Sequence, residues 1–108
     1  MKKKIGFAGF SLLITFVTAI TVMAGYNFGP DNIFHLEASA GISWKGLWVE
    51  GKMSNAKLEA IEYSKRVYAR SGATGTYSSW AEPSIDPVTH RNYGSFDNDY
   101  AEVRGEWK

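Results

Sequence analysis

The stretch DYAEVRGEW, residues 99–107, decides the fold class of this chain. Small or apolar residues alternate along it with polar or aromatic ones, which is the period of two expected when successive side chains point to opposite faces of a sheet. One face of the predicted strand carries Ala101, Val103, Gly105 and Trp107, and the other carries Tyr100, Glu102, Arg104 and Glu106. A strand of this kind is half-buried, so its apolar face needs a second layer of structure.

Three segments upstream also predict strands. Residues 33–38 and 42–50 predict a hairpin whose connection is Ser39, Ala40 and Gly41, and in its second strand Trp44 and Trp48 share one face. Residues 74–81 are rich in threonine and aromatic side chains, a composition that fits a pleated surface.

Residues 57–70 are open to two interpretations. Their length and their content of Glu, Lys, Ala and Arg favour a helix. Wound as a helix, however, the segment has apolar side chains on opposite sides and no polar face. Laid out as a strand, it places Ile61, Tyr63, Val67 and Ala69 on one face, where Lys65 is the exception. We therefore favour a strand.

The remaining segments predict turns. Pro83 and Pro87 predict a surface loop over residues 82–91, and glycine and asparagine interrupt residues 92–98. Five or six short strands separated by turns predict an all-β fold, a small antiparallel β-sandwich or barrel.

The first 24 residues predict an N-terminal signal peptide. Lys2, Lys3 and Lys4 precede an uncharged run over residues 5–24 that closes on small side chains, which predicts cleavage between Ala24 and Gly25. Residues 25–32, with Gly29 and Pro30, then predict a flexible lead-in, and residues 33–108 a single β domain. The alternative is an uncleaved anchor, because 20 uncharged residues can span a bilayer as a helix.

Composition narrows the function classes. The chain has no cysteine, which excludes disulfides and thiolate metal sites. Without the three leader lysines, nine basic and eleven acidic residues remain, a net charge of −2. Such a balance gives little long-range attraction to nucleic acid or anionic lipid, so we expect no nucleic-acid partner, and membrane contact only through the leader.

Catalytic, metal and cofactor sites are not expected from the sequence. His35 and His90 lie in different segments without a nucleophile motif. Glu82, Asp86 and His90 would share one face only of a helix, which the prolines oppose. The run Asp97-Asn98-Asp99 lacks the glycine and the closing glutamate of an EF-hand, so it predicts a turn.

The aromatic side chains are the strongest functional indication. Four Trp and six Tyr exceed what a small core needs, so some should be exposed. If Trp44 and Trp48 face inward, the outward faces carry a candidate binding surface of rings and arginines that suits sugars, a peptidoglycan precursor or a protein partner. Its members are Arg66, Tyr68, Arg70, Tyr100 and Arg104. The competing interpretation is that another sheet covers these side chains.

Part of the chain resembles a known family. The motif Gly46-Leu47-Trp48, a following Gly51, the pair Ser64-Lys65 and the aromatic C-terminal strand are similar to the lactococcin 972 family of bacteriocins. The resemblance implies export by a cleaved leader, a cysteine-free β-sandwich and binding of the cell-wall precursor lipid II. It transfers no site residue, because Val67-Tyr68 stands where that family has a histidine.

Two function classes follow from these features. The first is a secreted, extracellular, bacteriocin-like protein of a Gram-positive bacterium that binds a cell-wall precursor or another envelope component of related bacteria. The second is an exported or membrane-anchored envelope protein that binds a wall polymer or a protein partner. Both are non-enzymatic. A secreted enzyme is the third class and ranks below them, since a chain this short has little room for a pocket.

Overall fold

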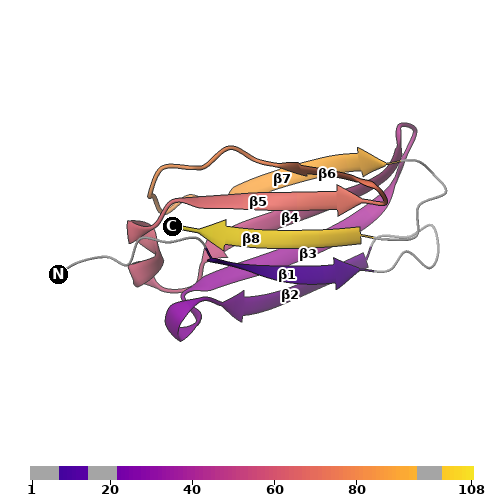
Figure 1. Ribbon diagram of the computed structural model, residues 1–108. Helices are drawn as coiled ribbons and strands as arrows, with labels where there is room; N and C mark the ends of the chain where they lie inside the picture. The colour runs from indigo at the N-terminus through magenta and orange to yellow at the C-terminus, as the bar shows by residue number, and fades with distance from the viewer. Residues whose placement is uncertain (1–7, 15–21, 95–100) are drawn as a thin grey trace.

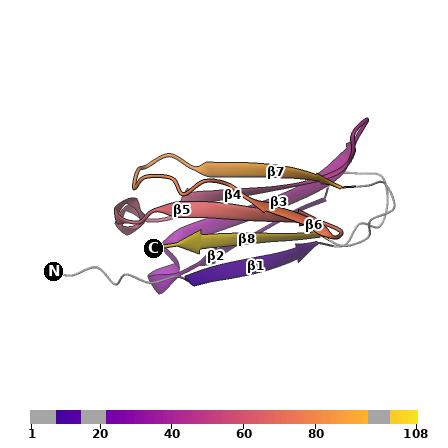
Figure 2. The same ribbon diagram turned by 45° about the horizontal axis from the view of Figure 1, so that its top comes forward.

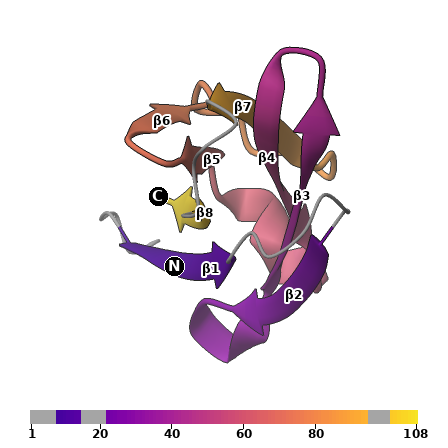
Figure 3. The ribbon, with the colours of Figure 1, turned by 90° about the vertical axis from the view of Figure 1, so that its right-hand side faces the viewer.

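The protein folds into two antiparallel sheets packed face to face. The computed structural model describes residues 8–14, 22–94 and 101–108 (Figure 1). Seen from the end, the sheets form two layers (Figure 3). The predicted all-β sandwich is therefore confirmed.

Each sheet has four strands, and every pairing between neighbours is antiparallel. The first sheet has the order β1 (Ala8–Ile14), β8 (Ala101–Trp107), β5 (Lys65–Ser71) and β6 (Thr74–Tyr77). The second sheet has the order β2 (Val22–Phe28), β3 (Phe34–Ser43), β4 (Gly46–Asn55) and β7 (Val88–Gly94). Two short 3₁₀ helices, η1 (Pro30–Asn32) and η2 (Leu58–Glu62), connect strands at one end of the molecule (Figure 1).

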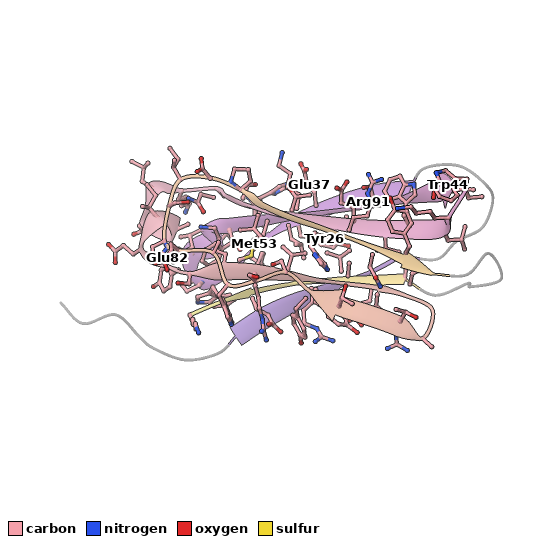
Figure 4. The ribbon with its side chains drawn as sticks, turned by 90° about the horizontal axis from the view of Figure 1, so that it is seen from above. Tyr26, Glu37, Trp44, Met53, Glu82 and Arg91 are labelled. Atoms are coloured by element: carbon pink, nitrogen blue, oxygen red, sulfur yellow. The ribbon has the colours of Figure 1, made fainter. Side chains whose placement is uncertain are left out.

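The core lies between the two sheets and is made by alternate residues of the strands. Val67 on β5 and Val103 on β8 are fully buried in one cluster with Leu36 and Met53 of the second sheet. Figure 4 shows Met53 between the layers. A Cβ added to Gly51 would lie 2.6 Å from a Val67 methyl group and would also overlap Val103. The sheets thus approach so closely there that only glycine fits.

An aromatic cluster closes one end of the core. The ring of Phe34 lies 5.2 Å from that of Trp107 and 5.8 Å from that of Tyr63, centroid to centroid. Phe28 packs against both Phe34 and Trp107. In a chain without cysteine, these large rings supply buried area that holds the two sheets together.

The turn of the first hairpin differs from its predicted position. β3 continues through Ser39–Gly41 to Ser43, and the turn consists of Trp44 and Lys45. A Cβ on Gly41 would lie 2.7 Å from the Trp48 ring, so this glycine makes room for a ring from the neighbouring strand rather than for a turn. Leu47 is buried, whereas Trp48 is half-buried on the outer face and Trp44 is exposed. The inward placement considered for Trp44 and Trp48 is therefore wrong.

The ambiguous segment contains both a helix and a strand. Residues 58–62 form η2, and the strand β5 begins at Lys65. The prediction of one strand over 57–70 is wrong for its first half, where backbone bonds such as Tyr63 N–H to Ala60 O wind the chain into a 3₁₀ turn. In the second half Lys65, Val67 and Ala69 face the core, as the alternation predicts.

The predicted loop over residues 82–91 is too long. It ends at Pro87, and β7 follows immediately. Val88 packs against the core, but the next two inward-facing residues of β7 are polar, which hides the strand in the sequence. The Nδ2 of Asn92 donates to Thr74 O at 2.7 Å, and the Nε2 of His90 lies 2.7 Å from Thr76 Oγ1. These bonds tie β7 to β6 and join the two sheets along one side. β6 itself ends at Tyr77, before the predicted limit at residue 81, and an isolated bridge pairs Ala81 with Lys65.

Two strands lie in the region predicted as leader and lead-in. β1 pairs with β8 from Ala8 opposite Trp107 to Ile14 opposite Ala101, and β2 pairs with β3. Residues 25–28 end β2 and residues 30–32 form η1, so the stretch predicted as a flexible lead-in contains regular structure. Cleavage between Ala24 and Gly25 stays a prediction, and it would remove β1 and the start of β2. Within the described residues, no helix is long and apolar enough to span a membrane.

Candidate functional site

The outer face of the first sheet brings together four of the five predicted binding residues. Arg66, Tyr68 and Arg70 alternate on β5 with buried residues and point away from the core. Arg104 lies on the neighbouring β8, directly opposite Tyr68. Tyr100, the fifth residue, lies outside the described residues.

Rings and guanidinium groups stack along this face. The guanidinium of Arg66 lies 3.9 Å from the ring centroid of Tyr77 and 4.6 Å from that of Trp80. The guanidinium of Arg104 lies 4.5 Å from the ring of Tyr68, whose centroid is 4.7 Å from that of Tyr77. We call this set, Arg66, Tyr68, Tyr77, Trp80 and Arg104, the ring–arginine ladder. Cations over aromatic faces attract the ring quadrupole, so the contacts fix the positions of both partners.

Two glutamates of β8 hold the arginines in place. Glu106 is almost completely buried, and its Oε1 accepts a hydrogen bond from Arg66 Nε at 2.6 Å while Oε2 lies 3.9 Å from Arg104. Glu102 accepts from Arg104 at 3.2 Å. Burial opposes the charge of Arg104, but the charges of Glu102 and Glu106 outweigh that effect and raise the pKa of Arg104. The guanidinium therefore stays charged.

Gly75 and the turn between β5 and β6 determine where two more of the side chains on this face lie. A Cβ on Gly75 of β6 would lie 2.6 Å from Tyr68 Cζ, so the absence of a side chain lets the Tyr68 ring lie flat across the strand. Arg70 has a different place from that predicted: its Nε donates to Gly72 O at 2.7 Å, in the turn between β5 and β6. Its guanidinium supports this turn, whereas those of Arg66 and Arg104 stack in the ladder.

The sequence did not assign Tyr77, Trp80 and Lys108 to the surface. Tyr77 enters because β6 pairs with β5 and sets it opposite Tyr68. Trp80 lies in the segment after β6, and the Lys108 ammonium is 4.4 Å from its ring. The alternation within residues 74–81 could have indicated Tyr77, whereas the position of Trp80 depends on the path of a connection that the sequence pattern does not reveal.

This face is suited to binding. Tyr77 is 41% exposed, and the arginines beside it are only partly buried, so a ligand would meet aromatic faces and charged N–H donors at fixed positions. Rings and arginines in this arrangement recognise sugars, phosphates and carboxylates.

The histidines lie away from this face. On β3, His35 Nε2 is 3.5 Å from Glu37 Oε2, while His90 of β7 contacts Thr76. Burial lowers the pKa of His90, which favours its neutral form, and the hydrogen bond to Thr76 offsets part of that effect. In the described part of the chain no three His, Cys, Asp or Glu side chains cluster as metal ligands, and the residues 97–99 considered for a metal lie outside it.

No family model, curated protein or solved structure matches this chain. The fold and the site define a small all-β sandwich that carries the ring–arginine ladder on the outer face of one sheet.

Proposed function

We propose that this protein is a secreted, bacteriocin-like protein that binds a cell-envelope component of related bacteria through the ring–arginine ladder. The observation that carries the proposal is the contact of the Arg66 guanidinium with the rings of Tyr77 and Trp80 on the outer face of the first sheet, where Tyr77 is exposed. A cell-wall precursor combines sugar rings, phosphate and carboxylate, which are the groups that aromatic faces and guanidinium groups bind.

The rigidity of the ladder supports a binding role. Glu106 and Glu102 orient the two arginines before any ligand binds, and Gly75, which has no side chain, leaves room for the Tyr68 ring to pack against β6. A surface whose side chains are already ordered loses less conformational entropy when it binds. The leader-like N-terminal segment and the resemblance to the lactococcin 972 family favour an extracellular target.

The second candidate is an exported or membrane-anchored envelope protein that binds a wall polymer or a protein partner without killing cells. The same ladder would serve as its binding surface. This alternative requires that residues 5–24 are not cleaved. Intact-mass analysis of culture supernatant and membranes separates the two, because a soluble species that begins at Gly25 supports the first and an uncut 108-residue membrane species supports the second.

The binding function is tested with the ladder variant Tyr77→Ala and the control Leu58→Ala. Both residues are exposed, but Leu58 lies on η2, outside the ladder. Wild-type protein and the control should inhibit close relatives and bind their isolated envelopes. Tyr77→Ala should lose the inhibition and bind the envelopes more weakly than the control does, at unchanged circular dichroism. Absence of inhibition by the wild type across a broad panel of relatives overturns the bacteriocin function, and absence of envelope binding overturns both candidates.

A further inference from the structure

The tip of the β3–β4 hairpin carries a second group of exposed rings, on the other sheet. Trp44 is 86% exposed and Ile42 44% exposed. The hairpin projects past the ends of the neighbouring strands β5 and β7, and Figure 2 shows the same projection from another angle. An apolar tip at the end of a molecule is exposed to water unless something else covers it.

A group of charged and aromatic side chains lies next to this tip, and we call it the collar. Its members are Lys45, Trp48, Glu50, Arg91 and Tyr93. The Lys45 ammonium lies 5.6 Å from the Trp44 ring and 5.1 Å from the Tyr93 ring. Trp48 and Tyr93 are partners across β4 and β7, and the guanidinium of Arg91 lies 4.0 Å from the Trp48 ring. Figure 4 shows Arg91 and Trp44 toward the same end of the molecule. Glu50 is the acid of the collar among the described residues, and its Oε1 is 3.4 Å from Arg91.

The tip is held rigid. The Ser43 hydroxyl accepts from the backbone N–H of Lys45 at 3.2 Å and donates to Gly46 O at 3.3 Å. Gly46 has a positive φ of 136°, a conformation that glycine adopts easily and that closes the turn in two residues. Trp44 therefore projects from an ordered turn.

We propose that this hairpin tip docks the protein on an anionic lipid surface, a local contact that the net charge of the chain did not predict and that adds to the contact expected through the leader. Trp44 and Ile42 enter the headgroup region, where the amphipathic indole is most favourable, and the collar of Lys45, Arg91 and Tyr93 remains at the level of the lipid phosphates. Among the described residues the tip combines the exposed side chains of Trp44 and Ile42 with the cations Lys45 and Arg91, and this combination fits an anionic lipid surface. Docking is separate from the proposed target binding, which uses the opposite sheet.

The test measures partition of the full chain into vesicles of one part phosphatidylglycerol to three parts phosphatidylcholine, by sedimentation. The double variant Trp44→Ala/Lys45→Ala removes the exposed ring and the ammonium group of the tip. The control is Lys52→Ala, because Lys52 is an exposed lysine on β4, the strand that follows the turn, and lies away from the tip. Any contribution of residues 5–24 is common to all three proteins. We expect the tip variant to bind about tenfold more weakly and the control to bind like the wild type.

Two further readouts make the result specific. Quenching of tryptophan fluorescence by lipids brominated near the headgroup should fall in Trp44→Phe. The ladder variant Tyr77→Ala should bind vesicles normally, since vesicles contain no wall target. Equal partition of wild type and tip variant overturns the proposal, as does Trp44-dependent binding to purified cell wall but not to vesicles. Either failure leaves the ladder function intact, because envelope binding by Tyr77→Ala measures that function separately.

Discussion

Arg66 and Glu106 face each other across β5 and β8, and the Nε of Arg66 donates to Oε1 of Glu106 over 2.6 Å. They are separated by 40 positions in the chain. The glutamate is 2% exposed and the arginine side chain 22% exposed, so the ion pair is largely withdrawn from water. Arg66 also contacts the rings of Tyr77 and Trp80, and Glu106 also lies near Arg104. The pair is therefore the centre of the ladder.

The first prediction concerns this pair. Replacing Glu106 by Gln keeps the shape but removes the buried carboxylate that Arg66 contacts, whereas Arg104 keeps its hydrogen bond to Glu102. The free energy of unfolding should fall by about 2 kcal/mol, less than for a fully buried pair because water reaches Arg66. Urea unfolding measures the change, and Glu37→Gln, at an exposed position of β3, is the control. A loss equal to that of the control would show that Glu106 does not hold the arginines.

The second prediction concerns Lys65, which is fully buried on the inner side of β5 and donates from Nζ to Ser84 O at 3.3 Å. Burial lowers the pKa of Lys65, and the negative charge of Asp86 reduces that shift. Between this lowered pKa and the ordinary value of 10.5, the unfolded chain binds more protons than the folded one. Stability should therefore rise with pH across that window.

The variant Lys65→Met tests this pH dependence, because it keeps the buried stem and removes the titrating group. The difference in unfolding free energy between the variant and the wild type should be largest near pH 7 and shrink as the pH rises toward 10. Urea unfolding at several pH values measures it. A difference that does not vary with pH would mean that the Lys65 ammonium is well solvated in the folded protein.

The third prediction concerns the closest approach of the two sheets. Gly51→Ala would place a methyl group against Val67 and Val103 in the middle of the core. Overpacking of this kind should lower the free energy of unfolding by about 1–3 kcal/mol. Lys52→Ala, at the next and exposed position of β4, should change it little. Full stability of Gly51→Ala would indicate that the sheets lie farther apart than in the structure.

The fourth prediction concerns β1. In the full chain β8 lies between β1 and β5, whereas a form that begins at Gly25 lacks β1. The β8 amides that bond to β1 should then exchange with solvent faster in the shorter form, while the amides that bond to β5 stay protected. Hydrogen-exchange mass spectrometry measures this, with the central strand β4 as internal reference. Equal exchange of β8 in the two forms would show that β1 does not cover this edge.

The alternation of residues 101–107 predicted β8 correctly, and the same pattern placed Val67 and Ala69 in the core. These positions are predictable because a residue's face depends only on its parity along a strand. β7 was missed because its inward residues His90 and Asn92 are polar, and their partners come from β6. The hairpin turn was misplaced because small residues suggested a bend at 39–41, where Gly41 instead makes room for Trp48.

Part of the candidate site was predictable because the face on which a strand residue lies depends on its parity. Arg66, Tyr68 and Arg104 followed from parity, since each lies on the outward face of its own strand. Tyr77 and Trp80 did not follow, because their contacts with Arg66 depend on where the chain goes after β5. Arg70 was predicted to belong to the site, but its Nε donates a hydrogen bond to Gly72 O in the turn that follows β5.

By itself the sequence determined the all-β class, the absence of disulfides and the outward faces of β5 and β8, since composition and alternation are local properties of the chain. Only the tertiary structure decided which ring meets which guanidinium, that Lys65 is buried and that Trp44 is exposed. Those outcomes depend on the register between strands far apart in sequence and on the path of their connections. A shift of one residue in that register would turn each strand's other face to the core.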